Sequence, residues 1–286
     1  MRARRLADRL FAALAFACAA VATAVLLAIF AAIALRGLPA VSWSFLTEQI
    51  RLVGAAGGVF YNVVGTLILI ATALLVALPP AVGLSLAHGV YLSRGGLLRR
   101  WLTLFLYVLN GTPSILFGIF GLIVFVNFFG WGKSWLTGGI LLGFMILPTV
   151  AVALIERIEG LPRSYLEAAA GLGLRQSQIV WSVVLPQSLS GLVTGSLLGL
   201  ARAAGETAPI MFTATIFAGA TLPSGIRESP VLSLPYHIFV LAQDSFDPLV
   251  ASKVWGAAVV LLGLVLCLSL LALPMRLRIH EEARHG

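Results

Sequence analysis

The sequence contains few charged residues and few cysteines. Of its 286 residues, 10% are charged and 60% are hydrophobic, and the mean hydropathy is +1.03. A soluble domain has about 25% charged and about 45–50% apolar residues, so this composition excludes an ordinary soluble protein. The two cysteines, Cys18 and Cys267, both lie inside apolar runs. Buried thiols are the default there, and neither a disulfide nor a metal site is predicted.

Charge-free runs long enough to cross a bilayer recur along the whole chain. A helix needs roughly 20 residues to span a hydrocarbon core of about 30 Å. The sequence therefore predicts an all-α integral membrane protein with six transmembrane helices, carried by residues 10–35, 52–93, 101–132, 134–155, 176–201 and 254–275. The second helix is expected to begin near Val59 or Asn62. The fifth is expected to begin near Gly191 and to continue past Arg202 and Glu206.

Lysines and arginines are distributed unevenly between the two sides of this topology. The smaller group consists of Arg36, Arg51, Lys133, Arg227 and Lys253. Apart from Arg202, which lies inside a span, the other basic residues, Arg94 among them, share the side of the N-terminus. Because basic loops resist translocation, both termini are expected in the cytoplasm. The net charge of +8 then reflects topology, and nucleic acid is not predicted as a partner. The first apolar run exceeds the length of a signal peptide, so an uncleaved anchor is expected.

The longest cytoplasmic loop, residues 156–190, carries a spaced motif. It comprises Glu167, Ala168, Ala169, Gly173, Leu185 and Pro186, with Val183 at an aliphatic position two residues before Leu185. Good helix formers surround Glu167, and Gly173 permits a sharp turn, so two short helices are expected to meet at that glycine. The alternative is an amphipathic loop that rests on the membrane surface. The loop belongs to an expected core domain of residues 59–274, preceded by a section of residues 1–58 and followed by a tail of residues 275–286.

Arg202 is the one basic residue placed inside a span. If the fifth helix starts at Gly191, Arg202 lies about 17 Å along it, close to the midplane. A charge there costs at least roughly 2.5–3.5 kcal/mol, which makes Arg202 a functional candidate, and Glu206 can pair with it from the next turn. The alternative is a structural ion pair. The small-residue stripe Gly191, Gly195 and Gly199 shares this side of the helix, which suggests a close helix interface, such as one with a second subunit.

Polar residues also flank a proline in the third run. Thr112, Ser114 and Asn110 lie beside Pro113, where a helix loosens because proline removes a backbone hydrogen bond. These side chains are predicted to line a polar path through the membrane. A plain proline kink is the alternative.

Two of these patterns resemble those of a known family. The motif in residues 156–190 resembles the EAA loop of ABC importer permeases, and the string Arg-Ala-Ala-Gly-Glu-Thr-Ala-Pro at residues 202–209 resembles the membrane signature of phosphate-specific ABC permeases. These phosphate importers have two kinds of permease subunit, PstA-type and PstC-type. The Thr-Ala-Pro that follows Gly-Glu here is more similar to the signature of the PstA-type subunit. Residues 111–118 and 234–235 resemble two further sequence stretches of the same permease family. The resemblance covers most of the chain after about Asn62.

The resemblance implies a type I permease fold with cytoplasmic EAA coupling helices in the inner membrane of a bacterium. It implies a subunit of an ATP-driven phosphate importer, with a PstC-type permease, a PstS-type phosphate-binding protein and a PstB-type ATPase dimer as partners. Arg202 is the expected phosphate contact, since its planar fork binds oxyanions in bidentate fashion. Glu206, Thr207, Thr112 and Ser114 complete the expected pathway.

The chain is not expected to be an enzyme or to bind a cofactor, because the ATP is expected to be used by the partner ATPase. Gly132-Lys133-Ser134 ends like a phosphate-binding loop, but Asn127 stands where the first glycine is required. Several alternatives stay open. They are a PstC-type partner, a permease for another oxyanion, a secondary anion transporter with Glu206 as proton relay, and a multi-span membrane enzyme.

Overall fold

The computed structural model describes residues 2–51, 56–93, 95–217, 219, 222–243 and 247–285, and the side chains of these residues except 2–7 and 275–285. Residues 52–55, with which the second apolar run begins, and Arg94, counted above among the cytoplasmic arginines, lie outside the described residues. The described chain is helical apart from short connections, one isolated bridge and a two-stranded antiparallel hairpin, β1 (Ile50–Arg51) and β2 (Ala56–Gly57).

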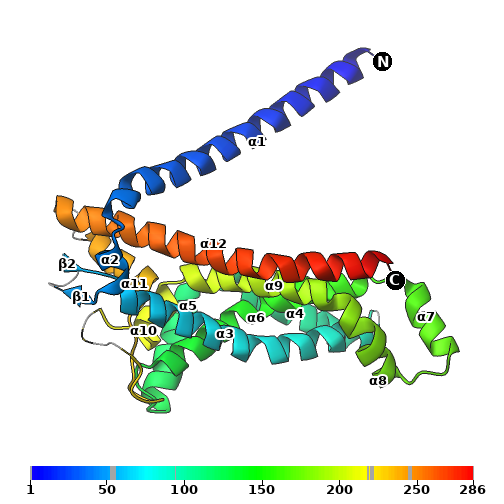
Figure 1. Ribbon diagram of the computed structural model, residues 1–286. Coiled ribbons are helices and arrows are strands. Elements are labelled where there is room, and N and C mark those ends of the chain that lie inside the picture. Colours follow the sequence, from blue (N-terminus) through cyan, green and yellow to red (C-terminus); the bar gives the residue numbers. More distant parts are fainter. Residues whose placement is uncertain are drawn as a thin grey trace.

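Helices account for nearly all of the described fold (Figure 1). In chain order they are α1 (Arg2–Gly37), α2 (Trp43–Thr47), α3 (Phe60–Leu86), α4 (Leu97–Gly111), α5 (Ser114–Gly121), α6 (Trp135–Glu159), α7 (Arg163–Gly171), α8 (Gln176–Ile179), α9 (Leu185–Gly205), α10 (Ala208–Thr213), α11 (Leu234–Gln243) and α12 (Pro248–His285). Stretches of π-helix at Ala87–Tyr91 and Leu122–Phe128 extend α3 and α5, and a third at Val180–Val184 joins α8 to α9.

The six predicted spans correspond to five long apolar helices and one bent pair. The long helices are α1, α3, α6, α12 and the continuous segment Gln176–Gly205, and the pair α4 and α5 turns through 92°. The prediction of α3 is confirmed, since it begins at Phe60. The third span is divided into two helices at Pro113, where the sequence predicts a loosened helix. Pro113 lacks an amide N–H and disfavours helical geometry at Thr112, whose φ and ψ are −70° and 129°.

The fifth span also differs from its prediction. Its helix starts at Gln176, well before Gly191, and ends at Gly205 instead of continuing past Arg202 and Glu206. Glu206 is extended, with φ −78° and ψ 129°, and Pro209 lies in the first turn of α10. Glycine tolerates the break in the helix, and proline favours the start of a new helix over the continuation of the old one. The chain thus re-enters helix in a new direction directly after the candidate residues.

The central element of the bundle is α6. In its most apolar window 72% of the residues are buried, against 11% for α12 and none for α1. Glycines let its neighbours approach closely: a Cβ on Gly139 would come within 2.4 Å of Thr72 on α3, and one on Gly195 of α9 within 3.0 Å of the Val150 backbone. Buried Met145 and Ile146 fill the space between these contacts. The fold therefore holds α3, α6 and α9 as one packed unit.

The outermost helices lie along the edge of this unit. Helix α1 leaves the bundle and meets α12 only near its own C-terminal end, where Gly37 packs on the Trp255 backbone and Arg36 lies 5.1 Å from the Trp255 ring (Figure 1). Cys18 on α1 and Cys267 on α12 are exposed rather than buried within the chain. Both chain ends lie toward the end of the molecule that carries α7 and α8, whereas α2, α11 and the hairpin lie at the other (Figure 1).

Candidate functional site

Arg202 lies in the last turn of α9, where it is part of a polar cluster built by three helices. Its Nη1 donates to Asn110 Oδ1 at 2.7 Å and to Thr149 Oγ1 at 3.3 Å, and its Nε lies 3.8 Å from Glu206 Oε1. Thr149 Oγ1 is also 3.4 Å from Asn110 Oδ1. The side chains of Arg202 and Glu206 keep 27% and 18% of their accessible surface. The cluster is therefore partly desolvated and still reachable.

The residues from the three helices each lie at a helix end or next to a proline within a helix. Asn110 is in the last turn of α4 before the bend at Pro113, Thr149 follows Pro148 inside α6, and Arg202 precedes the end of α9 at Gly205. Interrupted helices leave backbone groups unpaired, and such backbone is tolerated at membrane depth where it lines a cavity or is buried in protein. The arrangement is that of a site, because three helices direct polar groups to one place.

The structure joins some of the sequence-predicted path residues and separates others. Glu206 stays close to Arg202, although through extended backbone after the helix rather than through the next helical turn. Thr112 donates to Val108 O at 2.7 Å and so satisfies the carbonyl freed at the bend, and Ser114 begins α5. Thr207 directly precedes α10, and its side chain makes no capping bond to that helix. The depth of Arg202 in the bilayer and the roles of these residues stay predictions.

Sequence reasoning missed Thr149. It lies directly after Pro148, in the same Pro-polar pattern that drew attention to Asn110 and Thr112, but the fourth apolar run was treated as an uninterrupted span. The physical signal was present, since proline in a helix frees the carbonyl one turn earlier and nearby hydroxyl groups can compensate.

The electrostatics of the cluster leave capacity for an anion. Arg202 lies at the C-terminal end of α9, where the helix dipole favours a positive charge, and Glu206 offsets part of that charge at 3.8 Å. Among the described residues, its Nη2 makes no hydrogen bond. A guanidinium carries five N–H donors in a planar fork, so two of them can still be directed at the oxygens of a tetrahedral oxyanion.

The glycine stripe of α9 determines how Arg202 reaches Thr149. A Cβ on Gly191 would lie 2.5 Å from the Arg157 Cβ, and one on Gly199 would lie 3.2 Å from the Val150 Cγ2, both on α6. The stripe therefore packs on α6 of the same chain. The close approach that suggested a second permease subunit is an internal contact, because α6 already occupies the groove that the glycines leave.

The loop of residues 156–190 contains the two expected short helices. Helix α7 carries Glu167, Ala168 and Ala169, and Gly173 follows with φ +79°, a left-handed conformation that favours glycine. Ala169 is buried, whereas Glu167 and Ala168 are exposed. After α8, the helix runs without a break through Leu185 and Pro186 into α9. The motif therefore leads directly into the helix that holds Arg202, which provides a rigid mechanical connection.

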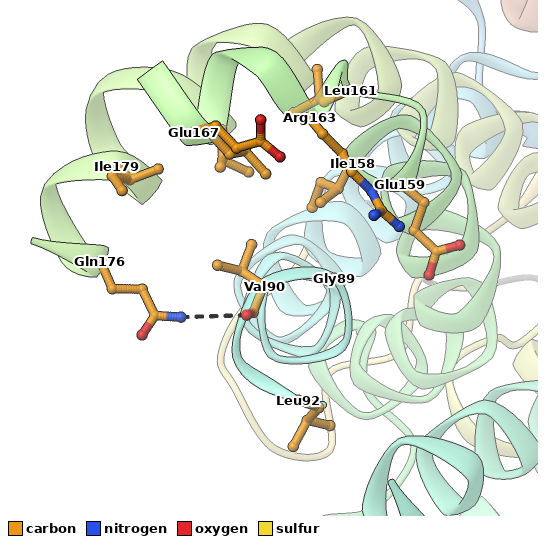
Figure 2. A pocket seen from close by; sticks show the side chains of 12 residues that line it. Gly89, Val90, Leu92, Ile158, Glu159, Leu161, Arg163, Glu167, Gln176 and Ile179 are labelled. Atoms are coloured by element: carbon orange, nitrogen blue, oxygen red, sulfur yellow. Dashed lines mark hydrogen bonds between the residues drawn. The ribbon is translucent and has the colours of Figure 1, made fainter. Parts of the chain in front are cut away.

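A cavity of about 440 Å³ separates α7 and α8 from the end of the bundle (Figure 2). Glu167 of α7 lies on one side, and Val90 and Ile158 lie on the other. Gln176 Nε2 donates to Val90 O at 3.3 Å and closes one edge. The cavity lies beside α7, whose Leu166 and buried Ala169 still pack against the rest of the chain.

Two histidines, His88 and His237, are buried. His88 is 7% exposed; its Nε2 lies 2.9 Å from Thr103 Oγ1, and its Nδ1 lies 3.3 Å from Glu159 Oε1, which also pairs with Arg99. This group ties α3, α4 and α6 together at the α7 end. His237 on α11 is 2% exposed and stacks on Phe217 with ring centroids 5.8 Å apart. Burial lowers the pKa of His237 to about 4.

The arrangement of the helices matches that of a solved transporter. A chain of the inward-facing MetNI methionine ABC transporter superposes with a TM-score of 0.58, covering 78% of this chain and 94% of that one at 16% identity. At that level of identity the likeness concerns the fold alone. The chain thus has the type I fold of ABC importer permeases, as the resemblance of its sequence motifs implied.

Comparison of sequences narrows this class to a family. Residues 80–277 match the family described as the inner membrane component of binding-protein-dependent transport systems. The phosphate transport system permease protein PstA 2 of Mycobacterium bovis is 32% identical over 82% of this chain and 77% of its own. A probable PstA protein of Methanocaldococcus jannaschii is 29% identical over 98% of this chain and 96% of its own. The chain belongs to the family of binding-protein-dependent transport system inner membrane components.

Proposed function

We propose that this chain is the PstA-type permease subunit of an ATP-driven phosphate importer and forms half of its translocation pathway. The observation that carries the proposal is the cluster in which Arg202, still able to donate hydrogen bonds, is held between Asn110, Thr149 and Glu206, where α4 and α9 end beside Pro148 of α6. The relatives' designation as phosphate transport permeases supports the choice of substrate.

The chemistry of the cluster suits a partly protonated oxyanion. The free donors of Arg202 bind two oxygens of phosphate, and Glu206 is an acceptor for the hydroxyl group of hydrogen phosphate. Sulfate has no proton to donate at neutral pH, so the same carboxylate repels it. Without substrate, Glu206 and Asn110 offset the Arg202 charge.

The end of the molecule that carries α7 and α8 faces the cytoplasm in this proposal, together with both termini. A PstB-type ATPase dimer seats the short helices around Gly173, and a PstS-type protein delivers phosphate at the opposite end. A PstC-type permease completes the path. The chain itself binds no cofactor and catalyses no reaction, since ATP is hydrolysed by the ATPase. Movement of α7 reaches Arg202 through the continuous helix Gln176–Gly205.

Uptake of labelled phosphate into sealed vesicles that contain the whole importer tests the proposal. Arg202→Gln is expected to abolish uptake, and Glu206→Gln is expected to reduce the preference for phosphate over sulfate. Arg51→Gln, which removes an exposed charge that pairs with Glu48 and not with the cluster, is the matched control and should transport normally. Normal uptake by Arg202→Gln at wild-type membrane levels would refute the pathway. Uptake that persists without ATP but needs a proton gradient would instead indicate a secondary transporter.

A further inference from the structure

A second polar groove lies on the same seam between α6 and α9, closer to the coupling helices. It has a volume of about 350 Å³. Helix α6 contributes Glu156 and Arg157 to its wall, and α9 contributes Ser190, Thr194 and Leu198. The groove is open at the surface of this chain, and its polar groups are a guanidinium, two hydroxyls and a carboxylate.

Arg157 is held in this groove without a partner among the described residues. Its stem crosses α9 at Gly191, where a Cβ would come within 2.5 Å of the Arg157 Cβ and 3.0 Å of its Cγ. Its Nε is buried and makes no hydrogen bond to any described residue, and no described carboxylate lies within 4.0 Å of its guanidinium. An unpaired buried donor of a charged group costs free energy, so a ligand that accepts from Nε would relieve this cost.

The groove continues the face on which the Arg202 cluster lies. On α6, Thr149 and Arg157 are separated by two helical turns and share one face, about 12 Å apart along the axis. On α9, Arg202, Leu198 and Thr194 follow one another at intervals of four residues and share the facing side. An anion that leaves Arg202 toward α7 therefore passes Arg157 next.

We propose that Arg157, Ser190 and Thr194 form a second, inner binding site for a tetrahedral oxyanion; this inference rests on the proposed function for its choice of phosphate. Arg157 donates from Nε and its terminal nitrogens, and the Ser190 hydroxyl donates as well. Thr194 Oγ1 donates to Ser190 O at 2.8 Å, so its lone pairs remain to accept from a protonated oxygen.

Glu156 gives the inner site a lower affinity for the anion than the Arg202 cluster, which is the outer site. Its carboxylate lines the same groove, is exposed, and lies more than 4.0 Å from the Arg157 guanidinium, so it repels a bound anion more than it screens the arginine. Passage through a pathway requires sites that bind in sequence and weakly enough to release. An inner site with a nearby negative charge meets that requirement and favours release into the cytoplasm.

Protection of a cysteine in the groove from a thiol reagent tests the site directly. Leu198 lines the groove, is 54% exposed and is not a proposed ligand, so Leu198→Cys, in a chain whose Cys18 and Cys267 are replaced by alanine, reports on occupancy. In the full importer, inorganic phosphate at ten times its dissociation constant should slow labelling about tenfold, whereas chloride at equal ionic strength should not.

Variants identify which arginine gives the protection. Adding Arg157→Gln should abolish it, Arg157→Lys should retain part of it, and Arg202→Gln should leave it intact. Arg100→Gln, which removes an exposed charge from the same end of the molecule, is the matched control. Protection that is absent with Arg157 present, or that survives Arg157→Gln, would overturn the inner site.

Uptake kinetics separate this inference from the proposed function. Arg157→Gln should lower the maximal rate of phosphate uptake about tenfold or more, as expected for loss of a hydrogen bond to a charged group, with KM unchanged because the outer site binds first. A raised KM with an unchanged maximal rate would contradict the inner site. If the importer that carries Leu198→Cys, with Arg157 and Arg202 in place, shows protection by phosphate but takes up no phosphate, the proposed function fails and the inner site stands.

Discussion

Replacing the glycines of α9 by alanine, one at a time, is expected to destabilise the chain in a graded order. At Gly199 the nearest atom to a new Cβ is the Val150 Cγ2 at 3.2 Å, a side-chain atom that can shift. At Gly195 it meets the Cα and carbonyl oxygen of Val150, both at 3.0 Å, which are backbone atoms of the central helix. At Gly191 it meets the Arg157 Cβ at 2.5 Å, so α9 must move or Arg157 must leave its position.

The size of each effect is the difference between overpacking and helix propensity. Overpacking lowers the free energy of unfolding by about 1–3 kcal/mol. The higher helix propensity of alanine raises it by up to about 1 kcal/mol relative to glycine. Gly199→Ala should therefore be nearly neutral, Gly195→Ala should cost about 1 kcal/mol, and Gly191→Ala should cost about 2 kcal/mol. At Gly83 and Gly263 a new Cβ would meet no described atom within 4 Å, so their alanine variants should be unchanged or slightly more stable.

Thermal unfolding of the purified importer in detergent measures these differences, and phosphate uptake measures their effect on function. Because Arg202 reaches Thr149 across the same α6–α9 contact, uptake should fall in the same order as stability. A different order of melting temperatures, or an equal loss at Gly83, would refute the conclusion that these glycines are required for contact between α6 and α9.

Further predictions concern the site, the coupling loop and the outer end. Asn110→Ala removes the acceptor of the 2.7 Å bond from Arg202 and should raise the KM for phosphate about tenfold; an unchanged KM would contradict its positioning role. Gly173→Ala forces φ +79° on a residue with a Cβ, at a cost of about 1–2 kcal/mol, and should lower transport-coupled ATP hydrolysis, whereas Gly171→Ala should not. Because the pKa of His237 is lowered from 6.5 to about 4, the unfolded chain binds a proton more readily than the folded chain between these pH values. The free energy of unfolding should therefore have its full value above pH 6.5 and fall by up to about 3 kcal/mol as the pH falls toward 4. His237→Gln should lack this dependence, and a flat wild-type melting temperature over that range would contradict it.

The class of protein could be predicted from local sequence because its signals are local. Span length and hydropathy need only the residues of one helix, and the spacing from Glu167 to Pro186 lies within one loop. The start of α3 was confirmed at Phe60 for the same reason. Arg202 could be selected because a lone charge in an apolar run is costly wherever the helix lies.

Sequence reasoning was incomplete where neighbouring residues or other helices decided the outcome. The bend at Pro113 and the end of α9 at Gly205 depend on whether other elements satisfy the backbone groups that proline and glycine free. The burial of His88 and His237 depends on contacts with Thr103, Glu159 and Phe217, which are distant in sequence. No local pattern specifies such contacts.

The sequence by itself determined that this chain spans a membrane, that its loop of residues 156–190 forms two short helices around Gly173, and that Arg202 is the exceptional charge. Only the tertiary structure decided what surrounds that charge. It brought Asn110 and Thr149 to Arg202, packed the glycine stripe on α6 instead of on a second subunit, and left Arg157 without a described partner on the same seam. The physical reason is that helix period and hydropathy state which face of a helix is apolar, whereas the choice of the helix that covers it depends on side-chain shape and close packing between segments far apart in the chain.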